Sequence, residues 1–126
     1  MRARGFTLLE VLIALAIFAV VSATVLTATG RSLNNAARLE EVTLAGWIAD
    51  NRLTELQVAP GPPATGRQEQ ALEYAGRRWQ LLTQVESTTD ASLLRVTVWV
   101  APQAAAGRGS VETRAATSLT GFVEVR

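Results

Sequence analysis

The chain has 126 residues, the usual length of a single domain, and apolar residues make up 48% of it. It contains no cysteine and no histidine, which excludes disulfide bonds, Cys-His and Ser-His nucleophile pairs, and the usual zinc, copper and haem ligands. Because these residues are missing, we expect no enzymatic activity, no cofactor, no metal site and no small-molecule substrate. The formal net charge is only +1, so the chain has no strong overall positive charge that would attract nucleic acid.

A long apolar segment lies near the N-terminus. Every residue from 11 to 21 is apolar, and the apolar character extends outward over residues 6–29, a stretch of 24 residues. As a helix this stretch spans about 36 Å, enough to cross a bilayer. Arg2 and Arg4 precede it, and by the positive-inside tendency they predict that this end stays in the cytoplasm. Residues 6–29 are therefore predicted to form a transmembrane helix.

Glu10 carries the one charge within this segment. A carboxylate there costs on the order of 2.5–3.5 kcal/mol on insertion scales, so it needs a positive partner. Cleavage of the Gly5–Phe6 bond would create an α-amine on Phe6, which the carboxylate of Glu10 on a neighbouring helix could neutralise. The other interpretation is a glutamate at the membrane interface that reaches back to water.

A secretory signal peptide is an alternative for the same segment. The basic start, the apolar core and the small residues Val21-Ser22-Ala23 fit a signal that is removed after Ala23. This alternative predicts a secreted periplasmic binding domain. It accounts neither for Glu10 nor for the glycine between Arg4 and Phe6.

Helical periodicity continues from residue 33 to about residue 58 and ends at the prolines of residues 60–63. A helix that runs without interruption over residues 6–57 would be about 78 Å long. The second part carries two apolar stripes, which indicate two packing partners. One stripe comprises Leu33, Ala36, Ala37, Leu44, Trp47 and Ile48. We expect the other stripe to meet neighbouring subunits: Leu39, Val42, Gly46, Ala49, Leu53 and Leu56. The alternative is that both stripes are buried within the chain's own domain.

The C-terminal half is predicted to form strands. Residues 59–70 are expected to be an exposed loop, followed by strands at 71–74 and 78–87 with a tight turn at Ala75-Gly76-Arg77. A strand over 93–101 shows the clearest alternation. Residues 104–109 are a predicted flexible loop, and a last strand lies within 112–125, interrupted near Gly121. The fold class is therefore α+β, a long N-terminal helix packed on a C-terminal antiparallel sheet.

Two groups of polar residues were weighed as sites. Glu86 and Asp90 have a spacing that could serve acid–base chemistry, but nothing indicates a pocket around them. Arg77-Arg78-Trp79 could indicate nucleic acid, but a solubilising charge beside a core tryptophan is the favoured interpretation.

The segment from Arg4 to Glu10, Arg-Gly-Phe-Thr-Leu-Leu-Glu, resembles the leader and helix start of type IV pilins and type II secretion pseudopilins. The resemblance implies that a prepilin peptidase cuts after Gly5, that Phe6 is then N-methylated, and that Glu10 takes part in subunit docking. Residues 1–5 would be the leader peptide. Residues 6–29 would be the single pass through the inner membrane, and residues 30–126 a periplasmic domain.

Residues 47–56 and the strands after Gly76 resemble more narrowly the minor pseudopilin of the I type in type II secretion systems. The resemblance covers nearly the whole chain and is looser at residues 59–70 and 102–110. It implies a subunit of the pseudopilus tip that joins the J- and K-type minor pseudopilins. This subunit would help to start pseudopilus assembly for the export of folded proteins across the outer membrane. A minor pilin of a type IV pilus is the alternative.

Overall fold

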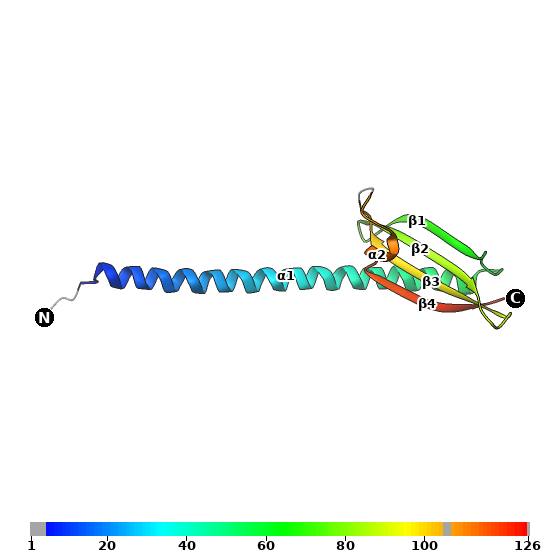
Figure 1. Ribbon diagram of the computed structural model, residues 1–126, viewed down its shortest axis with the longest axis horizontal. Coiled ribbons are helices and arrows are strands. Elements are labelled where there is room, and N and C mark those ends of the chain that lie inside the picture. Colours follow the sequence, from blue (N-terminus) through cyan, green and yellow to red (C-terminus); the bar gives the residue numbers. More distant parts are fainter. Residues whose placement is uncertain (1–4, 105–106, 126) are drawn as a thin grey trace. The chain divides into compact units, whose positions relative to one another are not determined.

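The computed structural model describes residues 5–104 and 107–125. The elements follow one another as α1 (Leu8–Val58), β1 (Gly66–Tyr74), β2 (Arg77–Ser87), β3 (Leu93–Pro102), α2 (Val111–Arg114) and β4 (Thr117–Glu124) (Figure 1). The chain divides into two compact units, Met1–Arg38 and Leu39–Arg126, and α1 contributes to both. The predicted α+β fold class, with one long N-terminal helix and an antiparallel sheet, is confirmed.

The described part of the first unit is mainly the N-terminal part of α1. Thr7 caps the helix, because its Oγ1 accepts a hydrogen bond from the backbone N–H of Glu10 at 3.2 Å. The segment is long and apolar enough to cross a membrane, with a mean hydropathy of 2.6. The hydroxyls of Thr24, Thr27 and Thr29 donate to carbonyls four residues earlier at 2.8–2.9 Å, so these polar groups are satisfied within the helix.

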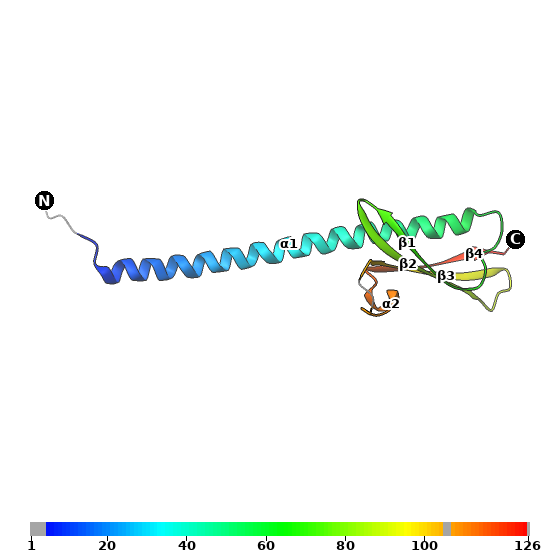
Figure 2. The same ribbon diagram turned by 90° about the horizontal axis from the view of Figure 1, so that it is seen from above.

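The second unit is built on a four-stranded sheet. The strand order is β1-β2-β3-β4, and every neighbouring pair is antiparallel. The C-terminal part of α1 covers one face of this sheet, and α2 lies on the other (Figure 2). On the α2 side, Val111 packs with Leu82 and Ala101 in a small second cluster.

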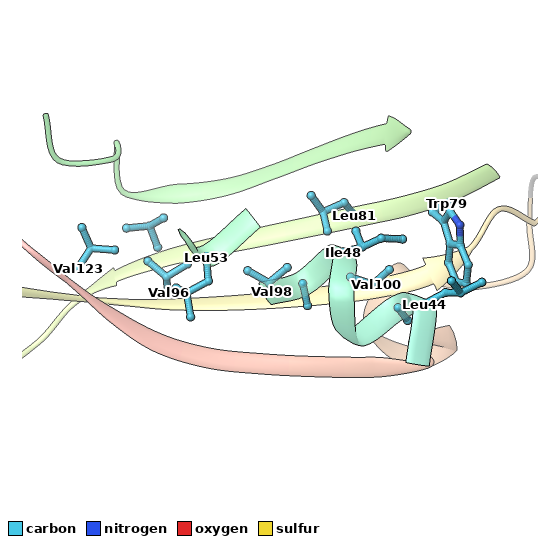
Figure 3. Packing of buried hydrophobic residues seen from close by; sticks show 12 residues of the cluster. Leu44, Ile48, Leu53, Trp79, Leu81, Val96, Val98, Val100 and Val123 are labelled. Atoms are coloured by element: carbon cyan, nitrogen blue, oxygen red, sulfur yellow. The ribbon is translucent and has the colours of Figure 1, made fainter. Parts of the chain in front are cut away.

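The main core lies between α1 and the sheet (Figure 3). The alternation predicted for residues 93–101 is confirmed in β3, and β2 shows the same pattern, since the inward-facing residues of both strands are almost fully buried. The largest core side chain is Trp79, which is 0% exposed and donates from Nε1 to the backbone oxygen of Tyr74 at 3.2 Å. The labelled members of the core are Leu44, Ile48, Leu53, Trp79, Leu81, Val96, Val98, Val100 and Val123.

The first strand is longer than predicted. β1 begins at Gly66 and pairs with β2 over nine positions, so the loop predicted for residues 59–70 is wrong over its last five residues. Those residues are exposed at the edge of the sheet and show no apolar alternation, so their pairing was not visible in the sequence. The turn that follows contains only Ala75 and Gly76, with φ of 52° and 72°, as a type I′ hairpin requires.

The last strand also differs from the prediction. Residues 111–114 form α2, whose N-cap is Ser110, and β4 begins only at Thr117. The expected interruption near Gly121 is wrong, because β4 is continuous there and Gly121 pairs with Val96. The glycine instead makes room for α1, since a Cβ at this position would lie 2.5 Å from Cδ2 of Leu53. Part of the loop predicted for 104–109, residues 105 and 106, lies outside the described residues.

Substitution of Gly121 by alanine should destabilise the second unit. The added methyl group would displace the Leu53 side chain, and overpacking of this kind costs about 1–3 kcal/mol. Leu53→Ala alone should also destabilise, because it leaves a cavity, but it should remove the penalty of Gly121→Ala. Free energies of unfolding of the two single variants and the double variant would test this. Strictly additive losses would contradict the proposed contact.

Candidate functional site

The residues around the predicted cleavage point lie outside the helix. Gly5, Phe6 and Thr7 precede α1, and the side chain of Phe6 is 83% exposed. A Cβ built on Gly5 would meet no atom within 4 Å. Exposed, non-helical backbone is where proteases cut most readily. The Gly5–Phe6 bond is thus sterically open.

Glu10 lies in the first turn of α1, within reach of this segment. Its side chain, together with five apolar residues, lines a hollow of about 510 Å³ on the helix surface. Among the residues that the structure describes, no arginine forms an ion pair with the Glu10 carboxylate. The carboxylate is therefore available to a positive group that is not among these residues. The hollow is lined by Phe6, Glu10, Val11, Ala14, Leu15 and Phe18.

Part of the stripe of α1 that was predicted to meet neighbouring subunits is instead buried within the second unit. Ala49 is 0% and Leu53 is 8% exposed, and both belong to the domain's own core, so their assignment to a face that meets other subunits is wrong. Leu56 is half-buried and packs against the same core. Leu39 and Val42, by contrast, are exposed.

The sheet buries an arc of α1 that lies between the two predicted stripes. The buried arc contains Leu44 and Ile48, which belong to the first predicted stripe, and Ala49 and Leu53, which belong to the second. Trp47 was predicted to share a face with Leu44 and Ile48, but it is 56% exposed on the side of α1 away from the sheet. Asp50 and Thr54 follow on the same side of the helix, and these polar residues could have indicated from the sequence that Trp47 is exposed. We call the exposed and half-buried residues of this side the outer helix face: Leu39, Val42, Thr43, Gly46 and Trp47.

The candidate acid–base pair has ordinary structural roles. Glu86 accepts a hydrogen bond from Nε2 of Gln84 at 2.8 Å. Oδ1 of Asp90 accepts from Oγ of Ser92 at 2.6 Å and from its backbone N–H at 2.9 Å. These two bonds lower the pKa of Asp90, which is the opposite of what a general acid needs.

The arginine–tryptophan group is engaged within the domain. The guanidinium of Arg77 lies 5.1 Å from the centre of the Trp79 ring and 3.8 Å from the carboxylate of Glu41. Arg78 pairs with Glu73 at 3.3 Å. Within residues 5–104 and 107–125, no group of three or more Asp or Glu side chains is placed to hold a metal ion.

Comparison with known families matches the chain in two places. A model described as type II secretion system (T2SS), protein I, matches residues 39–124. A model described as the prokaryotic N-terminal methylation motif matches residues 1–26, which include Gly5, Phe6 and Glu10.

Individual relatives agree with these matches. A protein of Pseudomonas aeruginosa is 61% identical over 123 residues, which cover 97% of this chain and 95% of the relative. An Escherichia coli protein is 42% identical over 97 residues, or 77% and 79% of the two chains. A Vibrio cholerae protein is 37% identical over 100 residues, or 79% and 84%. All three bear the name type II secretion system protein I.

Proposed function

We propose a role at the tip of the pseudopilus for this chain, which belongs to the type II secretion system protein I family and is a minor pseudopilin of that machine. At the tip it would join the J- and K-type minor pseudopilins and help to start pseudopilus assembly for the export of folded proteins. The family is a structural one, and the methylation motif implies other pseudopilins and a prepilin peptidase as partners. Membership of this family favours the secretion machine over a type IV pilus or a secreted binding domain.

The proposed processing is cleavage after Gly5 and N-methylation of Phe6. Two observations support it: the bond lies in exposed, non-helical backbone, and the methylation motif covers these residues. Residues 1–5 would be removed as a leader. Processing would leave Phe6 with a methylated ammonium group directly before the Thr7 cap.

The proposed location is the inner membrane. Among the residues that the structure describes, one helix, near the N-terminus, is long and apolar enough to serve as a membrane anchor, which agrees with a component of this machine. We propose that residues 6–29 cross the bilayer and that residues 30–126 lie in the periplasm. The arginines at positions 2 and 4 support this orientation, because basic residues favour the cytoplasmic side.

The observation that carries the proposal is the carboxylate of Glu10. It lies on a helix long and apolar enough to cross a membrane, and no described arginine forms an ion pair with it. A buried carboxylate costs several kcal/mol unless a positive group pairs with it. The methylated ammonium of Phe6 on a neighbouring subunit has the required charge and would lie at the same depth in the bilayer. Glu10 would therefore dock one subunit on the next.

The outer helix face is the second proposed contact with partner subunits. Leu39, Val42 and Gly46 remain from the predicted partner stripe, and Trp47 joins them. An exposed tryptophan beside small residues resembles the centre of many protein interfaces, where aromatic side chains are enriched. We propose that this face packs on the helices of the J- and K-type subunits.

Replacement of Glu10 with alanine should leave insertion and cleavage intact but weaken assembly. The variant loses the partner of the neighbour's ammonium, so the neighbour's charge is left unpaired in the bilayer. Co-purification of the J- and K-type subunits and secretion of an exported enzyme would measure the loss. Glu69→Ala is the matched control, since Glu69 is an exposed glutamate on β1 and lies on neither of the two proposed contacts. Normal secretion by the Glu10 variant would refute the docking role.

A further inference from the structure

β1 is an edge strand of the sheet, and the hydrogen-bond pattern shows which of its backbone groups point outward (Figure 1). The backbone N–H of Gln103 donates to the backbone oxygen of Arg78 at 3.1 Å, so the even-numbered residues of β2 bond to β3. The odd-numbered residues of β2 therefore bond to β1, where their partners are even-numbered. The backbone N–H and C=O groups that point out from the free edge consequently belong to Arg67, Glu69, Ala71 and Glu73.

The outer edge of β1 is open. Within residues 5–104 and 107–125, no group forms a hydrogen bond with these outward N–H and C=O groups, and the strand is exposed over most of its nine residues. The other edge differs, because Nε2 of Gln57 donates to the backbone oxygen of Phe122 in β4 at 3.2 Å. Proteins commonly protect an edge with a proline or a bulge, and β1 contains neither. It is therefore free to pair with a further strand.

Two pockets lie beside this edge, between β1 and α1. The even-numbered side chains of β1 face α1, as their buried cross-strand partners on β2 do. One pocket, of about 200 Å³, has apolar walls from Ile48, Leu72 and Leu81. The other, of about 430 Å³, has apolar walls from Leu56 and Val85. Both pockets can thus receive apolar side chains.

Arg52 lies between the two pockets and lines both of them. From α1, its Nη2 donates to Oε1 of Gln68 on β1 and its Nε to Oγ1 of Thr83 on β2, both at 3.4 Å. The side chain is only 17% exposed, so it forms a partition across the space between α1 and the sheet. A continuous helix does not fit a groove divided in this way. An extended strand does, because its alternate side chains project separately, about 7 Å apart.

We propose that the open edge of β1 and the two pockets bind an extended peptide segment of another protein as a fifth strand. The backbone of the segment pairs with the outward groups of residues 67, 69, 71 and 73. Its alternate side chains are apolar and enter the pockets on either side of Arg52. Strand addition of this kind draws its affinity from main-chain hydrogen bonds and its specificity from pockets for alternate side chains.

A second copy of this chain fits the edge poorly. Antiparallel pairing of two β1 strands has two-fold symmetry and would reverse the direction of α1 in the second copy. Two chains anchored through the same helix in one bilayer have their helices in the same direction. Parallel pairing would instead turn the charged side chains of residues 67, 69 and 73 toward the apolar pockets. The segment is therefore expected to come from a different protein.

Binding of a synthetic peptide to the full chain in detergent tests the proposal. The probe is a capped, fluorescently labelled peptide of nine residues in which leucine alternates with threonine, and anisotropy measures its dissociation constant. N-methylation of one alternate set of its amides should weaken binding at least tenfold, because those amides face β1. N-methylation of the other set should change binding by no more than about twofold. Equal effects of the two sets would overturn the proposal.

Proline substitutions test the same edge from the side of the protein. Ala71→Pro removes an outward N–H that the pairing with β2 does not use, so the fold should persist while peptide binding weakens about tenfold. Thr120→Pro is the matched control, because Thr120 also points its N–H outward, on β4. Glu69→Ala should bind normally, since its side chain lies on the face away from the pockets. Equal losses in Ala71→Pro and Thr120→Pro would contradict a site on β1.

Amide hydrogen exchange of the wild-type chain gives a readout that needs no variant. The peptide should slow exchange at the four outward amides of β1 and leave the edge of β4 unchanged. Protection of β4 alone, or binding without protection of β1, would overturn the proposal. So would self-association of the chain through β1 in the absence of peptide, because the edge would then belong to a second copy.

Discussion

Replacement of Gly5 with valine should leave residues 1–5 attached to the chain, whereas the wild-type mature chain should begin with N-methylated Phe6. A Cβ at Gly5 meets no atom of the chain within 4 Å, so the substitution leaves the fold of the chain undisturbed. Any loss of cleavage would therefore arise in the peptidase site, where a β-branched side chain would stand next to the bond to be cut. Intact-mass spectrometry of the membrane fraction would distinguish the two forms.

Gly30→Val is the control for this experiment. Gly30 is also surrounded by open space, but it lies well inside α1 and away from the bond. It should be cleaved and methylated as the wild type is. A wild-type N-terminus at Thr24 would contradict pilin-type processing, and normal cleavage of Gly5→Val would show that the peptidase does not require glycine at this position.

Truncation of Trp79 to alanine should destabilise the second unit by about 3–5 kcal/mol, the usual cost of removing a buried aromatic side chain. The side chain is 0% exposed, and its Nε1–H satisfies the backbone oxygen of Tyr74, so truncation creates a cavity and breaks a hydrogen bond. Because domains of this size are stable by only about 5–15 kcal/mol, a large share of the stability would be lost. Pulse proteolysis of the full chain in detergent would measure the free energy of unfolding.

Trp47 provides a matched control on the other side of α1. It is 56% exposed, so Trp47→Ala should change the free energy of unfolding by no more than about 0.5 kcal/mol. If the outer helix face binds partner subunits, the same variant should lose J- and K-type partners while it remains folded. Equal destabilisation by the two truncations would contradict the assignment of Trp79 to the core and Trp47 to the surface.

Local patterns were enough to predict much of the fold. The helix was predictable because residues 6–58 lack internal proline and carry continuous apolar and helical periodicity. β2 and β3 were predictable because inward residues such as Trp79 and Val98 recur at every second position, as a strand that packs on one face requires. The residues of the proposed N-terminal site were also visible, since a charge in an apolar run stands out without any tertiary information.

Features that depend on contact between distant segments were not predictable in the same way. Residues 66–70 pair with β2 at an exposed edge, where neither face imposes an apolar pattern. Gly121 looked like a break in a strand, whereas it is the point at which Leu53 of α1 comes closest to β4. The structural role of Gly121 therefore depends on Leu53, a residue 68 positions earlier in the chain.

The sequence by itself thus determined the long apolar segment, the glutamate within it and the family, because each is carried by neighbouring residues or their spacing. Only the tertiary structure decided which side of α1 remains open to a partner. The two apolar stripes were equivalent in the sequence, and the sheet covered an arc between them, burying Ala49 and Leu53 while leaving Trp47 exposed. The physical reason is that helical periodicity defines the relative angles of side chains, whereas the direction of burial is chosen by the surface against which the helix packs.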